Sequence, residues 1–243
     1  MKKHYDSTFY NNQREGSLRS AEVVVPHIID LLQPRSVIDV GCGVGTWLSV
    51  FQKQGVSEIL GIDGHHVEKD KLYIENFIAM DLEGDWEIKR KFDLAMSLEV
   101  AEHLTVPAGD YLVKVLTRLA PVVFFSAAIP FQEGSNHINE QWQSYWATRF
   151  ANLGYIAIDA IRPRIWNEPG VEPWYCQNSF LYVDKSYLCS AENLKSQVAN
   201  VNYIDYVHPG IYKRFNNLDY MSGKRLVLEI YNRLLRRAMR LIK

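Results

Sequence analysis

Residues 36–46 are Ser-Val-Ile-Asp-Val-Gly-Cys-Gly-Val-Gly-Thr, an apolar run that holds one acid, Asp39, and leads into three glycines spaced G-x-G-x-G. Glycine allows the tight turns and the close backbone approach of a ligand-binding loop between a buried strand and a helix. Dinucleotide-binding loops have the spacing G-x-G-x-x-G and hold a pyrophosphate. In this chain the third glycine comes one residue early, and Asp39 would repel a pyrophosphate but suits a cation. The stretch therefore predicts a strand, a ligand-binding loop and a helix.

Outward from this loop, short apolar segments alternate with helical ones, as in a parallel sheet covered on both faces. Strands are predicted at 36–40, 58–63, within 73–80, and at 92–97, 122–128, 155–161 and 179–183. Helices are predicted at 21–32 after a Ser20 cap, and at 46–54, 99–103, 108–119 and 142–153. The last two strands follow each other without an obvious helix between them, so one of them is expected to be antiparallel. The fold class is an α/β, doubly wound, mostly parallel seven-stranded sheet.

Composition excludes several other classes of protein. The chain has 243 residues, 47% of them apolar and 23% charged, which is typical of a globular protein and not of a disordered or fibrous one. It has no apolar run of about 18 residues, so no transmembrane helix is expected. The three cysteines, Cys42, Cys176 and Cys189, lack metal-type spacing and cannot form a disulfide framework, which favours a cytoplasmic location.

The net charge of −1 conceals an asymmetry along the chain. Residues 222–243 carry seven Lys or Arg against one acid, Glu229, which leaves a net −7 on the first 221 residues. A body this acidic is a poor match for a nucleic-acid backbone, so no nucleic-acid partner is expected. The basic segment has apolar residues at helical spacing and predicts an amphipathic helix that packs on its own domain, forms a homodimer or contacts a membrane surface.

These observations divide the chain into three parts. Residues 1–20 are predicted to be an N-terminal arm or lid, and residues 21–185 the ligand-binding domain. Residues 186–243 are predicted to be a helical C-terminal extension.

Four motifs in order resemble those of class I S-adenosylmethionine-dependent methyltransferases, over roughly residues 20–185. They are Asp39-Val40-Gly41-Cys42-Gly43-Val44-Gly45-Thr46, Gly61-Ile62-Asp63, Met80-Asp81-Leu82 and Phe92-Asp93-Leu94-Ala95-Met96-Ser97-Leu98-Glu99. The resemblance implies S-adenosylmethionine as cofactor, with Asp39 and Gly41, Gly43 and Gly45 along its methionine part. It implies Asp63 on the ribose, and Asp81 with Leu82 at the adenine.

The acceptor chemistry is expected beyond the carboxyl ends of the fourth and fifth strands, opposite the cofactor. There, Glu99, Glu102 and His103 would share one face of a helix, and the loop after the fifth strand adds His137. These four residues could bind Mg²⁺ or Mn²⁺, an arrangement similar to the Glu-x-x-Glu-His metal site of small-RNA 2′-O-methyltransferases. Two alternatives stay open: His137 acts as a metal-free general base with Glu99 near the cofactor, or the group is structural.

The prediction for function is O-methyl transfer to a hydroxyl of a sugar or sugar-containing metabolite. The stretch from Ser126 to Val183 looks like a bacterial methyltransferase group associated with glycan and natural-product assembly, and its tryptophans suit sugar faces. A phenolic or carboxylate acceptor is the nearest alternative. Rivals from other classes are a nicotinamide oxidoreductase, disfavoured by the G-x-G-x-G spacing, and a non-catalytic cofactor-binding partner of a glycan enzyme.

Overall fold

The computed structural model describes residues 7–132, 134–216, 223, 226–228 and 230–231. Residues up to Tyr206 form one compact unit, and residues from Val207 onward form a second. The predicted amphipathic helix over 222–243 falls mostly on residues outside those described. None of the described helices is both long and apolar enough to cross a membrane.

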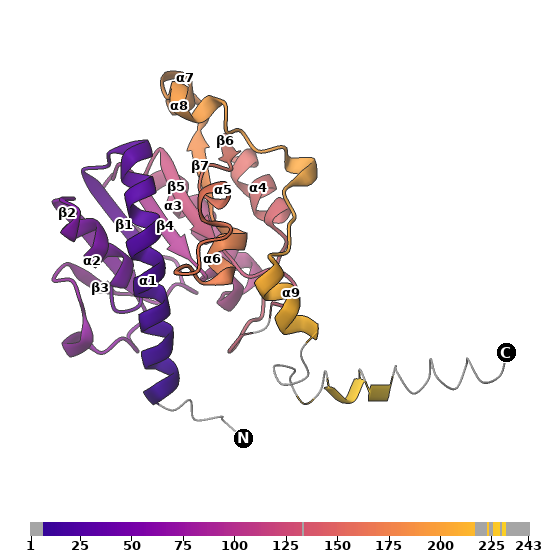
Figure 1. Ribbon diagram of the computed structural model, residues 1–243. Coiled ribbons are helices and arrows are strands. Elements are labelled where there is room, and N and C mark those ends of the chain that lie inside the picture. The colour runs from indigo at the N-terminus through magenta and orange to yellow at the C-terminus, as the bar shows by residue number, and fades with distance from the viewer. Residues whose placement is uncertain (1–6, 133, 217–222, 224–225, 229, 232–243) are drawn as a thin grey trace. The chain divides into compact units, whose positions relative to one another are not determined.

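Within the described residues, the strands of the first unit form one seven-stranded sheet in the order β3-β2-β1-β4-β5-β7-β6 (Figure 1). The strands are β1 Ser36–Val40, β2 Glu58–Asp63, β3 Phe77–Ala79, β4 Leu94–Leu98, β5 Val122–Ser126, β6 Tyr155–Ile158 and β7 Phe180–Asp184. β7 runs antiparallel to both β5 and β6, and the other pairs are parallel. The doubly wound, mostly parallel sheet predicted from the sequence is confirmed, including its antiparallel member.

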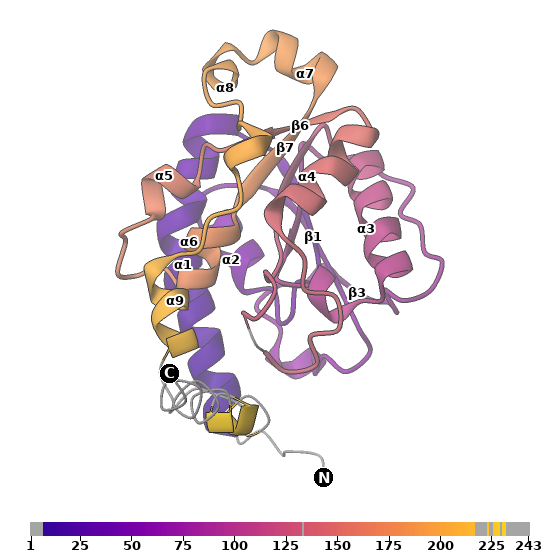
Figure 2. The same ribbon diagram turned by 90° about the vertical axis from the view of Figure 1, so that its right-hand side faces the viewer.

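Helices cover both faces of this sheet, as Figures 1 and 2 show from two directions. The helices of the first unit are α1 Ser7–Leu32, α2 Thr46–Lys53, α3 Val106–Leu119, α4 Gln143–Asn152, α5 Arg162–Ile165, α6 Pro173–Asn178, α7 Lys185–Ser190 and α8 Glu192–Lys195, with short 3₁₀ turns η1 Lys69–Lys71, η2 Ala101–His103 and η3 Val201–Tyr203. The second unit contains α9 Pro209–Asn216. Apolar side chains alternate along β5: Phe124 joins the core under α1 and α2, and Phe125 joins the core under α3 and α4. Both faces are therefore buried, which is why the strands are apolar throughout.

Three predicted helical features are wrong. The first helix begins at Ser7 rather than Ala21, and Ser20 lies inside it, donating its hydroxyl to the Gly16 carbonyl at 2.7 Å. Pro26 is also inside the helix. The predicted helix over Glu99–His103 is only the 3₁₀ turn η2, and α5 and α6 lie between the last two strands, where no helix was expected.

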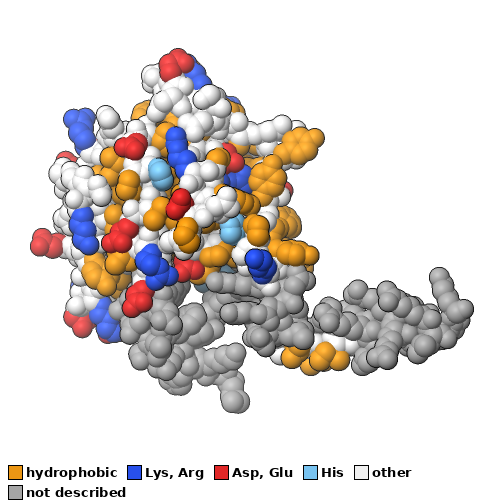
Figure 3. Space-filling view, viewed as in Figure 1, with side chains coloured by type: hydrophobic (Ala, Val, Ile, Leu, Met, Phe, Trp, Pro, Cys, Tyr) orange, Lys and Arg blue, Asp and Glu red, His pale blue; other side chains and the backbone are white. Residues whose placement is uncertain are grey.

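The face of the first unit that carries α1 presents acidic and basic side chains interspersed with apolar ones (Figure 3). The sheet order reverses between β1 and β4, since β1 continues to β2 on one side and β4 continues to β5 on the other. Loops after the carboxyl ends of such strands diverge and leave a crevice where ligands bind in open α/β sheets. The segments after β1 and β4 are therefore the place to look for the site.

Candidate functional site

The glycine loop after β1 depends on left-handed backbone at all three glycines, with φ of 84° at Gly41, 55° at Gly43 and 80° at Gly45. A side chain at Gly41 would place Cβ 2.2 Å from Cγ2 of Val100, so this loop touches the segment after β4. At Gly43, by contrast, no described heavy atom lies within 4 Å of an added Cβ. The loop thus packs tightly at its ends and leaves open space above its middle glycine.

One carboxylate contacts this loop and another lies in the strand that leads into it. Asp63, at the end of β2, accepts the Gly43 N–H through Oδ2 at 2.6 Å and the Gly64 N–H through Oδ1 at 2.6 Å. Asp39 is only 2% exposed, and its Oδ1 has no hydrogen-bond partner among the residues described. Burial, and next the nearby Asp63 carboxylate, raise the pKa of Asp39 to about 7. A cationic ligand would satisfy Asp39, which is what the ammonium of S-adenosylmethionine provides.

The predicted adenine-contacting pair lies beyond β3, in the turn after that strand. Leu82 is buried at 8% exposure, whereas Asp81 is exposed and accepts the Glu83 N–H at 3.0 Å through Oδ1. The structure thus shows a capped turn at Asp81 with an apolar residue beside it.

Glu99 follows β4 directly and has a left-handed backbone, with φ of 55°. Its carboxylate accepts hydrogen bonds from Gln132 Nε2 at 2.8 Å and Asn178 Nδ2 at 3.2 Å. Burial raises the pKa of Glu99, and the bonds from Asn178 and Gln132 offset part of that rise. Because Glu99 lies outside η2, it does not share a helix face with Glu102 and His103, so that geometric prediction is wrong. Asn178 and Gln132 were not predicted as site residues.

Glu102 is fully buried, and neither of its carboxylate oxygens has a hydrogen bond of standard geometry in the described part of the chain. Burial raises its pKa well above the ordinary value and the nearby Glu99 carboxylate raises it further, while the backbone N–H groups of Glu102 and Ala128 offset part of that rise. Such a group avoids the cost of a buried charge either by keeping its proton or by meeting a positive charge.

The loop between β5 and α4 is held against η2 by backbone bonds to the same residue. The Glu102 carbonyl accepts the N–H groups of Ile138 at 2.8 Å and Asn139 at 3.0 Å, and Asn139 Nδ2 donates to the Ala101 carbonyl. This brings His137 next to η2, although the two segments are far apart in sequence.

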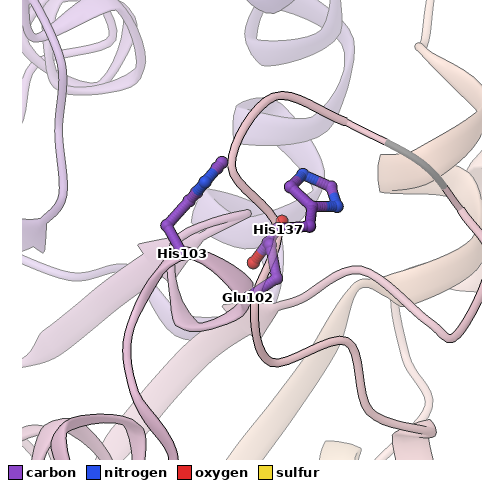
Figure 4. A group of neighbouring side chains, drawn as sticks. All are labelled: Glu102, His103 and His137. Carbon is purple, nitrogen blue, oxygen red and sulfur yellow. The ribbon is translucent and has the colours of Figure 1, made fainter.

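Three side chains converge there: Glu102, His103 and His137, whose ligand-type atoms all lie within 4.8 Å of one another. Figure 4 shows the Glu102 carboxylate between the two imidazoles, whose ring centroids are 4.8 Å apart. Partial burial lowers the pKa of His103, and the neighbouring His137 imidazole lowers it further. Both effects favour the neutral form of His103, which is the form that binds a metal. One carboxylate and two imidazoles form a donor set for a divalent transition metal. Glu99, the fourth predicted ligand, is not among the converging atoms.

Of the tryptophans between Ser126 and Val183, Trp146 belongs to the core, at 2% exposure, and Trp142 is 39% exposed. Glu140 was also not predicted: its Oε1 lies 2.8 Å from Nδ1 of His137. The only sequence signal for Glu140 is its position three residues after His137.

The sheet order and the glycine loop after β1 are those of a class I S-adenosylmethionine-dependent methyltransferase. A family model described as a methyltransferase domain matches residues 13–203, and the chain belongs to that family. Its cofactor is S-adenosylmethionine.

Two curated relatives are ubiquinone biosynthesis O-methyltransferases. The mitochondrial protein of Dictyostelium discoideum is 31% identical over 105 residues, covering 35% of this chain and 33% of the relative. The protein of Rhodopseudomonas palustris is 26% identical over 131 residues, covering 49% of this chain and 46% of the relative. The chain thus aligns with less than half the length of either relative.

Solved structures share the fold at low identity. The sugar N-methyltransferase KedS8 from Streptoalloteichus superposes with a TM-score of 0.56 at 14% identity, covering 76% of this chain and 96% of that one. The amino pentose methyltransferase CalS10 from Micromonospora echinaspora superposes with a TM-score of 0.54 at 13% identity. The match covers 76% of this chain and 100% of CalS10. These likenesses support the fold and do not identify the acceptor.

Proposed function

We propose that the chain methylates a hydroxyl oxygen of an acceptor with two neighbouring hydroxyls, a sugar or sugar-containing metabolite, with help from a divalent cation at Glu102, His103 and His137. One observation carries the proposal: a fully buried carboxylate, without a hydrogen bond of standard geometry among the described residues, converges with two imidazoles. The group lies at the carboxyl edge of β4, next to the cofactor loop, which Gly41 brings against Val100.

In this proposal the cofactor lies along the glycine loop. Asp39 holds its ammonium, Asp63 its ribose, and Leu82 with Asp81 its adenine. S-adenosylmethionine supplies a methyl group on a sulfonium that leaves readily, so the protein has only to align the acceptor oxygen and remove its proton. The strained Glu99, fixed by Gln132 and Asn178, forms a polar wall between the cofactor loop and the acceptor.

The donor set favours Mn²⁺ over Mg²⁺, since imidazole nitrogens suit transition metals and Mg²⁺ prefers oxygen ligands. Glu102, His103 and His137 would hold the cation, which would lower the pKa of a neighbouring hydroxyl. An imidazole that does not bind the cation would be the one to accept the released proton.

Turnover tests the proposal. We expect release of S-adenosylhomocysteine with at least one vicinal-diol sugar, loss of turnover in EDTA and recovery with Mn²⁺. Glu102→Gln should abolish the reaction, whereas Asp205→Asn, which alters an exposed carboxylate bonded to Ser144, should not. Turnover unaffected by EDTA and by Glu102→Gln would contradict the metal-assisted route.

A catechol is the second candidate acceptor, because the two curated relatives are named for ubiquinone biosynthesis and a catechol also presents neighbouring hydroxyls. A panel containing matched sugar diols and catechols distinguishes the two. Turnover confined to catechols would overturn the sugar proposal and leave the site geometry intact.

A further inference from the structure

Glu140 joins two parts of the loop between β5 and α4 through its two carboxylate oxygens. Oε1 lies 2.8 Å from Nδ1 of His137, and Oε2 accepts the backbone N–H of Phe131 at 2.7 Å. The glutamate is mostly covered, with a side chain 20% exposed, and so is His137, at 12%. One side chain therefore fixes both a member of the converging group and a residue nine positions away.

The contact at Nδ1 bears on which nitrogen of His137 carries the proton. A carboxylate next to Nδ1 favours the tautomer with its proton there, which leaves the lone pair on Nε2. Gly134 restricts the ring further, since an added Cβ there would lie 2.1 Å from Nε2. The imidazole is thus held between Glu140 and Gly134.

The second contact stabilises an unusual residue. Phe131 is a non-glycine residue with φ of 69°, and its side chain is 70% exposed. Left-handed backbone at a bulky residue is rare and persists where the surroundings hold it, often at ligand-binding positions. An exposed aromatic ring on a residue linked through Glu140 to His137 has the properties of a side chain that contacts an acceptor.

We infer that Glu140 is a positioning residue that directs Nε2 of His137 to the site and fixes Phe131 as a contact for the apolar face of the acceptor. The inference rests on the proposed function. It narrows the acceptor class to ring-bearing hydroxyl compounds with an apolar face next to the methylated hydroxyl, which includes pyranose faces and aromatic rings.

The test uses the full chain with Glu140→Ala, Glu140→Gln and Phe131→Gly, and Asp205→Ala as the matched control. Asp205 likewise accepts a backbone N–H and a side-chain donor, both from Ser144. Four readouts apply. They are S-adenosylhomocysteine affinity, Mn²⁺ affinity by calorimetry, the tautomer of His137 from long-range nitrogen–proton NMR spectra of the metal-free protein, and KM with kcat for a vicinal-diol sugar.

Glu140→Ala should shift the His137 tautomer signal and weaken Mn²⁺ binding about 10–100-fold, with unchanged affinity for S-adenosylhomocysteine. Glu140→Gln keeps one acceptor oxygen, so the loss of Mn²⁺ affinity in this variant should be smaller. Phe131→Gly should leave Mn²⁺ affinity unchanged, because glycine accepts the left-handed backbone, and should raise KM for the acceptor several-fold without lowering kcat. Asp205→Ala should change none of these quantities.

The outcomes separate this inference from the proposed function. If Glu102→Gln abolishes Mn²⁺ binding while Glu140→Ala changes neither Mn²⁺ affinity nor the tautomer signal, the role of Glu140 is wrong and the proposed function stands. If the wild type binds no Mn²⁺, the proposed metal is wrong, and the tautomer signal alone decides the role of Glu140. An unchanged KM in Phe131→Gly would overturn the acceptor contact.

Discussion

Glu102 carries a carboxylate that weakens the fold in the absence of a positive partner. Burial and the Glu99 carboxylate raise its pKa, so the folded protein binds a proton at this position more tightly than the unfolded chain does. Stability then falls as the pH rises above the unfolded value near 4.5. A residue that lowers the stability of the fold in this way is typical of a functional site.

Glu102→Gln should therefore leave the metal-free protein as stable as the wild type or more stable at pH 8, and should flatten the dependence of stability on pH. Urea unfolding at several pH values measures both effects. A large loss of stability in the variant would instead indicate that the carboxylate has a structural role.

Asp39 gives a second pH dependence, this time in cofactor binding. Its pKa is raised from 3.8 to about 7 by burial and by Asp63, so much of the cofactor-free protein has it protonated below pH 7. Only the ionised form attracts the cofactor ammonium. Affinity for S-adenosylhomocysteine should then fall up to about tenfold for each pH unit below 7 and level off above it.

Calorimetric titration from pH 5.5 to 8 measures this dependence. The isosteric variant Asp39→Asn is the control. It should bind S-adenosylhomocysteine more weakly than the wild type at pH 8, and its affinity should not depend on pH. The same slope in wild type and variant would show that another group is responsible.

At the scale of single elements, the glycine loop offers a pair of matched substitutions. Gly43 and Gly55 both have positive φ, 55° and 97°, and at neither does an added Cβ meet a described heavy atom within 4 Å. Gly43→Ala and Gly55→Ala should each cost about 1–2 kcal/mol in unfolding free energy from backbone strain. Only Gly43→Ala should also abolish binding of S-adenosylhomocysteine, because its methyl group fills space over the cofactor loop.

Unfolding and calorimetry on both variants check this prediction. Equal retention of cofactor binding in the two variants would mean that the cofactor does not lie over Gly43.

Helices, strands and loops were predictable from the sequence where neighbouring residues determine the local structure. The apolar run before the glycines, the loop itself and the position of Asp63 follow from neighbouring residues, and the structure places them as expected. The helix over Glu99–His103 was predicted from the same kind of spacing and is wrong, because Glu99 turns into left-handed backbone to meet Gln132 and Asn178. Those partners come from the segments after β5 and before β7.

Long-range contacts explain what the sequence could not show about the site. His137 lies beside Glu102, and two backbone N–H groups of its loop bond to the Glu102 carbonyl. Backbone bonds of this kind leave no signature in side-chain identity. The position of His137 could be guessed from its polar segment, but the support from Glu140 could not.

At the scale of the whole first unit, the long helix α1 is tied to the segment before α6. The buried Ser20 hydroxyl accepts the backbone N–H of Glu172 at 3.0 Å while donating to Gly16. Arg19 forms an ion pair with the Glu172 side chain at 3.2 Å, largely exposed on the arginine side. The helix α1 is thereby joined to a segment that lies more than 150 residues further along the chain.

Ser20→Ala should destabilise the protein by about 1–3 kcal/mol, because the N–H of Glu172 loses its partner. Arg19→Ala is the control and should cost no more than about 1 kcal/mol, since exposed ion pairs contribute little. Urea unfolding compares the two. Equal effects would mean that the Ser20 bond does not hold α1 in place.

The most direct test of the account is calorimetric titration of Mn²⁺ into the S-adenosylhomocysteine complex of the wild type and of Glu102→Gln. The account predicts saturable Mn²⁺ binding to the wild type and a loss of at least about tenfold in the variant. Affinity for S-adenosylhomocysteine should be equal in the two proteins. No Mn²⁺ binding to the wild type, or equal binding to both, would contradict a metal-assisted transfer at Glu102, His103 and His137.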